Sequence, residues 1–146
     1  MAILILQNGV RVRTFMHSVV NLLLVGVMGY MGLVFSDHNS LFTTASTYHA
    51  MIEVASQTTW AVSCHTVSMI GLVATFTKNW RVRVASAVML ATSHLIVAIY
   101  LFLGNPHGPG YGLFAGYAIL ALALAYSTAH MGVKLTERVE APSIPG

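Results

Sequence analysis

The stretch His49–Thr77 reads HAMIEVASQTTWAVSCHTVSMIGLVATFT, and it is long and mostly apolar. A helix needs about 20 apolar residues to cross a bilayer, so this stretch predicts a spanning helix over roughly residues 51–76. Five of its polar residues follow one another at spacings of four, four, seven and four and so share one helical face: His49, Glu53, Gln57, Cys64 and Ser68. His65 lies beside that face. A spanning helix keeps such a face where it meets other helices, a pore or a cofactor.

The composition of the whole chain is typical of a membrane protein. Of its 146 residues, 56% are hydrophobic and only 8% are charged, whereas soluble domains carry about 25% charged residues. The single cysteine, Cys64, lies in an apolar segment and cannot form a disulfide within the chain. We therefore predict an all-α integral membrane protein, with residues 1–146 forming a single membrane domain in the lipid bilayer.

Three further apolar runs complete a predicted bundle of four transmembrane helices. They cover roughly residues 14–35, 84–103 and 113–133. The first run is longer than the apolar core of a signal peptide, which has about 7–15 residues, so we expect an uncleaved helix. Glycines and prolines between residues 104 and 112 predict a turn. Two prolines in residues 134–146 predict an irregular tail.

The basic residues indicate the orientation of these helices. All seven fall on one side of a four-span topology: Arg11, Arg13, Lys78, Arg81, Arg83, Lys134 and Arg138. The first and third connections contain neither lysine nor arginine. Because basic residues mark the cytoplasmic side of a membrane protein, we expect both termini in the cytoplasm. This clustering concerns topology, and we predict no nucleic-acid partner.

Small residues recur along three of the predicted spans, where they would let helix backbones approach closely. The stripes are Gly26, Gly29 and Gly32 in the first span, Ala87, Ala91 and Ala98 in the third, and Ala118, Ala121, Ala125 and Gly132 in the fourth. None of these three stripes has the strict GxxxG spacing. We predict that they pack within the bundle; the alternative is that some join subunits of a homo-oligomer or of a larger membrane assembly.

Each predicted span carries one histidine: His17, His65, His94 and His130. At a rise of about 1.5 Å per residue, His65 and His94 lie near the centres of their spans, and the other two lie near the cytoplasmic ends. One interpretation is that these histidines are ligands, either of haem b through a pair of imidazoles from facing helices or of a metal ion. The other is hydrogen bonding between helices or solvation at the interface. We expect the second, with no bound cofactor and no metal.

Glu53 is the only acidic residue inside a predicted span, near its outer end and one turn after His49. Pairing with that histidine, or solvation at the interface, would explain it. The alternative is the charged mouth of a pore lined by Gln57, Ser63, Cys64 and Ser68. The sequence has no CxxC motif, no glycine-rich phosphate loop and no set of carboxylates suited to acid–base chemistry. We therefore predict no catalytic residue and expect no enzyme.

Several segments in the last two-thirds of the chain carry a resemblance to known proteins. A polar lead into a tryptophan (SQTTWAV), a short basic connection (KNWRVRV) and a Pro/Gly turn (GNPHGPGYG) precede an alanine-rich span. In this layout, the block from Trp60 to Tyr117 resembles small four-span membrane proteins encoded by bacteriophages. His94 departs from that group, in which this position more often looks aromatic. The resemblance implies a phage membrane component, such as a holin or a virion or host-takeover protein.

We therefore expect a non-enzymatic protein that self-associates in a bacterial inner membrane, in the manner of a holin. The charged segment Lys134–Glu140 (KLTERVE) is compatible with the charged tail that holins often have. Two alternatives stay open at this point. One is a haem- or quinone-binding membrane-anchor subunit of an electron-transfer complex, and the other is a purely structural accessory subunit of a larger membrane complex.

Overall fold

The computed structural model describes residues 2–37 and 45–140, with side chains for residues 15–37 and 45–134. Every element in these ranges is a helix: α1 (Ala2–Asp37), the 3₁₀ helix η1 (Ser46–Tyr48), α3 (His49–Ile52), α4 (Gln57–Phe76), α5 (Trp80–Gly104) and α6 (Gly110–Glu140). Four of these helices are long and apolar enough to cross a membrane. The predicted all-α fold with four transmembrane helices is confirmed.

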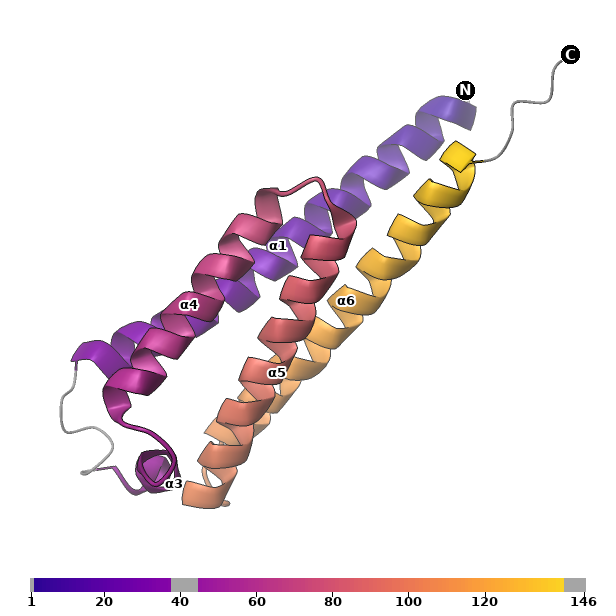
Figure 1. Cartoon of the computed structure of the whole chain (residues 1–146). Coiled ribbons are helices and arrows are strands. Elements are labelled where there is room, and N and C mark those ends of the chain that lie inside the picture. Colours follow the sequence, from indigo (N-terminus) through magenta and orange to yellow (C-terminus); the bar gives the residue numbers. More distant parts are fainter. Residues whose placement is uncertain (1, 38–44, 141–146) are drawn as a thin grey trace, which may run out of the picture.

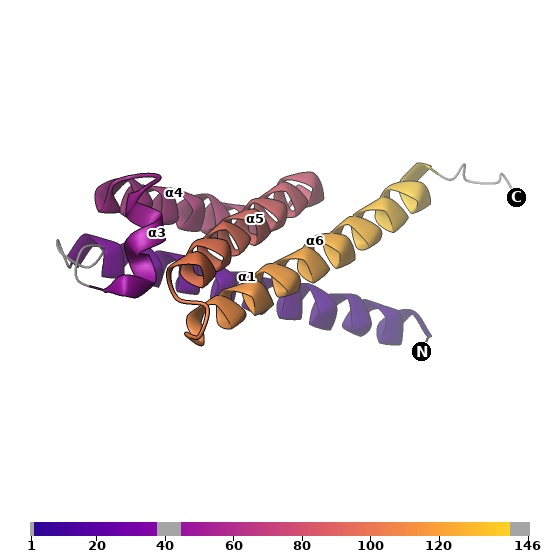
Figure 2. The ribbon, with the colours of Figure 1, turned by 90° about the horizontal axis from the view of Figure 1, so that it is seen from below.

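The four long helices run up and down in an antiparallel bundle (Figure 1). The closest packing joins α1 to α4 and α5 to α6, and contacts between α4 and α5 connect the two pairs. Seen from below, α1 crosses the α5–α6 pair at an angle, and its first turns diverge from the end of α6 (Figure 2). Both of these ends lie at the same end of the bundle as the α4–α5 connection, and α3 lies at the other (Figure 1).

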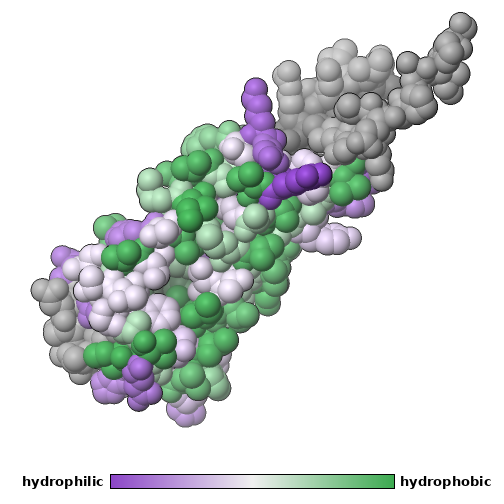
Figure 3. All heavy atoms as spheres, in the orientation of Figure 1, coloured by the Kyte–Doolittle hydropathy of each residue, from purple (hydrophilic) through white to green (hydrophobic). Residues whose placement is uncertain are grey.

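The surface between the two ends of the bundle is suited to lipid. Large apolar side chains are widely exposed there, including Val62 at 59% and Ile119 at 69%. Strongly hydrophilic residues gather towards the two ends, and green or pale residues cover the middle (Figure 3). Soluble proteins rarely expose apolar area on this scale, because contact with water is unfavourable. The distribution is that of a multi-pass membrane protein.

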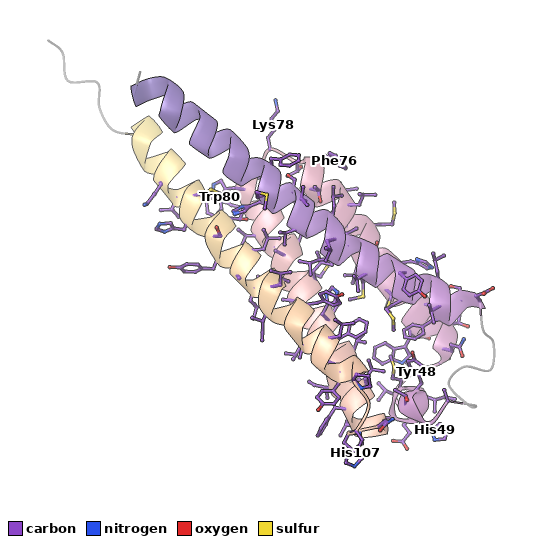
Figure 4. The ribbon with its side chains drawn as sticks, turned by 180° about the vertical axis from the view of Figure 1, so that it is seen from behind. Tyr48, His49, Phe76, Lys78, Trp80 and His107 are labelled. Atoms are coloured by element: carbon purple, nitrogen blue, oxygen red, sulfur yellow. The ribbon has the colours of Figure 1, made fainter. Side chains whose placement is uncertain are left out.

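The labelled polar side chains agree with this division into two ends and a middle. Lys78 points away from the bundle in the α4–α5 connection, with Trp80 close by on α5 (Figure 4). His49 and His107 lie at the opposite end (Figure 4). The three basic clusters of the sequence thus lie towards the same end of the bundle. Arg11 and Arg13 are in the first third of α1, the second cluster is in and just after the α4–α5 connection, and Lys134 and Arg138 are in the last turns of α6. That this side faces the cytoplasm stays a prediction.

The predicted small-residue stripes mostly pack within the chain. A Cβ atom added at Gly29 would meet Ser68 of α4, and one at Gly32 would meet His65. Six alanines of α5 and α6 are buried: Ala87, Ala91, Ala98, Ala118, Ala121 and Ala125. Gly132 lies against the ring of Trp80. The exception is Gly26, which is exposed and has nothing within 4 Å of an added Cβ.

The predicted second span, over residues 51–76, is wrong at its start. The short α3 ends at Ile52, and α4 begins only at Gln57. Ser56 caps α4 from an extended conformation, and its hydroxyl accepts a hydrogen bond from the backbone N–H of Thr59 at 3.2 Å. A serine hydroxyl that bonds the free N–H groups of a following helix favours a helix start at that point. The predicted five-residue face is therefore divided, and only its last three members belong to α4.

Other helices are longer than predicted. The backbone is helical from residue 2 rather than 14, α5 begins at Trp80 rather than 84, and α6 continues to Glu140. The predicted irregular tail is thus wrong over residues 134–140, where KLTERVE contains good helix formers and neither glycine nor proline. The rest of that tail, residues 141–146, and residues 38–44 of the predicted first connection lie outside the described residues.

Candidate functional site

The polar face of α4 is turned towards α1. The side-chain amide of Gln57 donates to the carbonyl of Phe35 at 2.7 Å, and the hydroxyl of Ser68 donates to the carbonyl of Val25 at 3.0 Å. Cys64, which lies between them on α4, is only 3% exposed. Within one chain this face therefore meets protein, where it holds α1 and α4 together.

Glu53 lies outside the long helices. It occupies the turn between α3 and α4, and its side chain is exposed. The prediction of an acidic residue inside a span is therefore wrong, because the helix that crosses the membrane begins after it. Its carboxylate lies at the end of the bundle that carries α3, where solvation satisfies the charge. The interfacial explanation of this residue fits the structure, and a position deep in the bundle does not.

The two central histidines have different neighbours. The ring of His65 lies over Gly32 of α1, with Nε2 at 3.5 Å from the hydroxyl oxygen of Ser36. His94 is fully buried, and its Nδ1 lies 2.7 Å from the carbonyl oxygen of Leu90. Because a carbonyl only accepts, Nδ1 carries the proton and Nε2 is the acceptor nitrogen. That Nε2 has no hydrogen-bond partner among the described residues.

Aromatic rings of α6 enclose His94. Its ring centroid lies 5.9 Å from that of Phe114 and 5.7 Å from that of Tyr117. The contacts of His65 are instead with α1. A haem held between these two histidines would need both rings to turn towards a shared space, and their present contacts point each ring to another helix. The geometry therefore favours the interhelical interpretation for His65. The hydrogen bond of His94 stays within α5, so this residue meets α6 through ring contacts alone.

The two outer histidines also differ. His17 links α1 to α6, with Nε2 at 3.0 Å from the hydroxyl of Ser127 and Nδ1 at 3.5 Å from that of Thr128. His130 is exposed and stacks on Tyr126, with ring planes 9° apart. Across the described ranges, no group of three or more His, Cys, Asp or Glu side chains is placed to hold a metal ion. His17 thus serves packing, as its hydrogen bonds indicate.

A polar layer near the α4–α5 connection joins the helices. The amide of Asn21 donates to the hydroxyl of Thr75 at 2.5 Å and to the carbonyl of Gly71 at 3.2 Å. The guanidinium of Arg83 donates to the hydroxyl of Ser18 at 3.4 Å. With the hydrogen bonds of His17, this layer links α1 to each of the other long helices. It satisfies polar groups that would be costly to leave unpaired in lipid.

A groove of about 230 Å³ lies between α4 and α5. Its lining includes Met28 of α1, Trp60, Ser63 and Cys64 of α4, and Ser93 and Val97 of α5. The sequence pointed to Ser63 and Cys64 as polar groups of a possible pore, but it gave no reason to select Ser93. Only the packing of α5 on α4 brings Ser93 to the same groove as Ser63.

A second open region lies on the outer face of α6. A hollow of about 520 Å³ surrounds Gly112, Gly116 and Ala123. A Cβ atom added at Gly112 or at Gly116 would have nothing within 4 Å. Residues 112–116 read GLFAG, which is a strict GxxxG spacing outside the three predicted small-residue stripes. The spacing itself was the available signal, since it lies at the start of a predicted span.

No protein-family model, curated protein or solved structure matches this chain. The resemblance to bacteriophage membrane proteins therefore stays a prediction from the sequence.

Proposed function

We propose that the protein is a non-enzymatic membrane protein whose copies associate within a bilayer through the outer face of α6. The observation that carries this proposal is the pair Gly112 and Gly116, four residues apart and both open to the surroundings. In lipid, a GxxxG pair allows the backbone of a second helix to approach closely, which gains van der Waals contact. The hollow that includes Ala123 continues this surface by two further turns of helix.

The other glycines of the long helices support this choice of face. Those at 29, 32, 71, 104, 110 and 132 have protein atoms within 4 Å of an added Cβ, so packing inside the chain already uses them. Gly26 of α1 is open but has no glycine four residues before or after it. The outer face of α6 is thus the surface on which the chain presents an unused GxxxG pair.

We further propose that the assembled protein acts in a bacterial inner membrane as a holin-like component that makes a lesion or channel. The support is the character of α4, which is the least hydrophobic and least buried of the four spans. It exposes the hydroxyl-bearing side chains Thr58, Thr59 and Thr66 on the outside of the bundle. In a ring of subunits, a water-filled space would suit such side chains better than lipid would.

The first experiment tests association. Purified protein reconstituted in lipid vesicles is crosslinked, and its mass in detergent is measured by light scattering, for the native chain and for Gly116→Leu. Gly26→Leu is the matched control, because it adds the same side chain at another open glycine. We expect oligomers for the native chain and the control, and monomers for Gly116→Leu. A monomeric native protein, or an unchanged oligomer in Gly116→Leu, would contradict the α6 interface.

The second experiment tests the lesion. The native chain and both variants are expressed in bacteria, and the membrane potential is followed with a voltage-sensitive dye. The native chain and Gly26→Leu are expected to collapse the potential, and Gly116→Leu is expected to leave it intact. Cells that keep their potential while they accumulate the oligomeric native protein would rule out a lesion and leave self-association standing.

A further inference from the structure

We infer from the structure that the groove between α4 and α5 binds a neutral, ring-sized lipophilic compound with hydrogen-bond acceptors, of the class of a quinone headgroup. This inference does not depend on the proposed self-association. The groove and the hollow around Gly112 and Gly116 have no lining residue in common. A ligand could therefore enter the groove of a single copy from the lipid.

The size of the groove limits what it holds. An apolar protein cavity of about 150 Å³ takes up benzene, and pockets for drug-sized ligands measure about 300–1,000 Å³. At about 230 Å³, the groove has room for one substituted ring. Its inner side is closed by protein, since Met28 is 0% and Val97 only 2% exposed. A compound with a long chain would place its ring in the groove and leave the chain in the lipid.

Two hydroxyl groups in the groove lack partners. Ser63 and Ser93 reach it from different helices, and neither forms a hydrogen bond within the described parts of the chain. Nearby threonines on the same helices are satisfied, because Thr66 and Thr92 donate to the carbonyl four residues earlier, at 2.8 and 3.0 Å. An unpaired hydroxyl in an apolar medium is costly. A ligand oxygen that accepts from either serine would remove that cost.

The other groups in the groove define the ligand further. None of the described residues that line it is charged, so a neutral ligand is favoured. Trp60 offers only its ring, because its indole N–H already donates to the carbonyl of Met51 at 2.9 Å. The thiol of Cys64 is a weak donor. The available polar groups are thus two hydroxyls and a thiol that can all donate, which matches carbonyl oxygens on a ring.

Trp60 provides a direct readout of binding. The chain has two tryptophans, so Trp60 is the only one left in Trp80→Phe. This variant in lipid nanodiscs is titrated with decylubiquinone, and the tryptophan fluorescence is recorded. We expect saturable quenching. Decylbenzene, which carries a similar chain and ring without carbonyl oxygens, should give no saturable change. If Trp80→Phe does not fold, as judged by circular dichroism, the titration is run on the native chain.

Substitution of the two serines separates binding from partition into the lipid. Ser63→Ala and Ser93→Ala are each expected to raise the Kd about two- to tenfold, because each removes one hydrogen bond. Thr66→Ala and Thr92→Ala are the matched controls on α4 and α5, and their Kd should stay within about twofold of the native value. Quenching that does not saturate, or a Kd that is unchanged in the double serine variant, would overturn the inference. Gly116→Leu should bind as the native chain does, whatever its oligomeric state.

Discussion

Replacing Gly32 with alanine is expected to loosen the packing of α1 on α4. A Cβ atom at this position would lie 2.8 Å from both Cε1 and Nδ1 of the His65 ring and 3.0 Å from its Cγ. Carbon atoms prefer separations of about 3.5–4.0 Å, so the ring or the helix has to move. The whole imidazole edge is involved rather than the tip of a flexible chain. Relief therefore requires a new rotamer of His65 or a wider gap between the helices.

Gly26 supplies the control that isolates this steric cost. It lies on the same helix, is exposed, and has nothing within 4 Å of an added Cβ. Alanine is more favourable than glycine inside a helix by about 1 kcal/mol, and both substitutions gain this equally. Overpacking a well-packed interface costs about 1–3 kcal/mol. Gly26→Ala should therefore be as stable as the native chain or more so, and Gly32→Ala should be about 1–3 kcal/mol less stable than Gly26→Ala.

The measurement is reversible unfolding in mixed micelles, followed by far-UV circular dichroism. A double-mutant cycle adds His65→Ala and the pair Gly32→Ala/His65→Ala, because removing the ring should recover most of the penalty. Equal free energies of unfolding for Gly26→Ala and Gly32→Ala would refute the reasoning. So would a penalty at Gly32 that stays the same with and without the imidazole ring.

Two further predictions concern the ends of the bundle. Asn21→Leu should lower the free energy of unfolding in the same assay by no more than about 1 kcal/mol. The reason is that Thr75, which accepts from Asn21, keeps its own hydrogen bond to the carbonyl of Gly71 at 2.8 Å. A loss above about 2 kcal/mol would contradict this. Burial, with a smaller contribution from Tyr30, raises the pKa of the Tyr48 hydroxyl above its usual 10.0. The stability that the protonated Tyr48 hydroxyl contributes is thus complete below pH 10.0 and disappears as the pH rises through the higher folded value. Above pH 10.0, the Tm of Tyr48→Phe should therefore drop less than the Tm of the native chain, as measured by differential scanning fluorimetry. Equal drops in the two proteins would argue against this.

The sequence was sufficient to predict the fold class and the number of spanning helices. Each span must satisfy its own backbone hydrogen bonds in lipid and must be about 20 apolar residues long, so four such runs already specify four helices. Helix ends were less predictable. Ser56, four residues after the end of α3, caps the start of α4 with its hydroxyl. This local hydrogen bond breaks the helix even though the apolar pattern continues through the segment. The segment 134–140 stays helical because nothing in it interrupts the helix.

For the candidate sites, the sequence was less informative than it was for the fold. The sequence by itself determined which residues are polar or small and how they repeat along each helix, because helical periodicity is a property of one segment. Only the tertiary structure decided that Gln57 and Ser68 bond to α1, that Ser93 joins Ser63 in one groove, and that Gly112 and Gly116 are left open. The physical reason is that periodicity defines a face but not its neighbour. That choice depends on how all four helices pack at once.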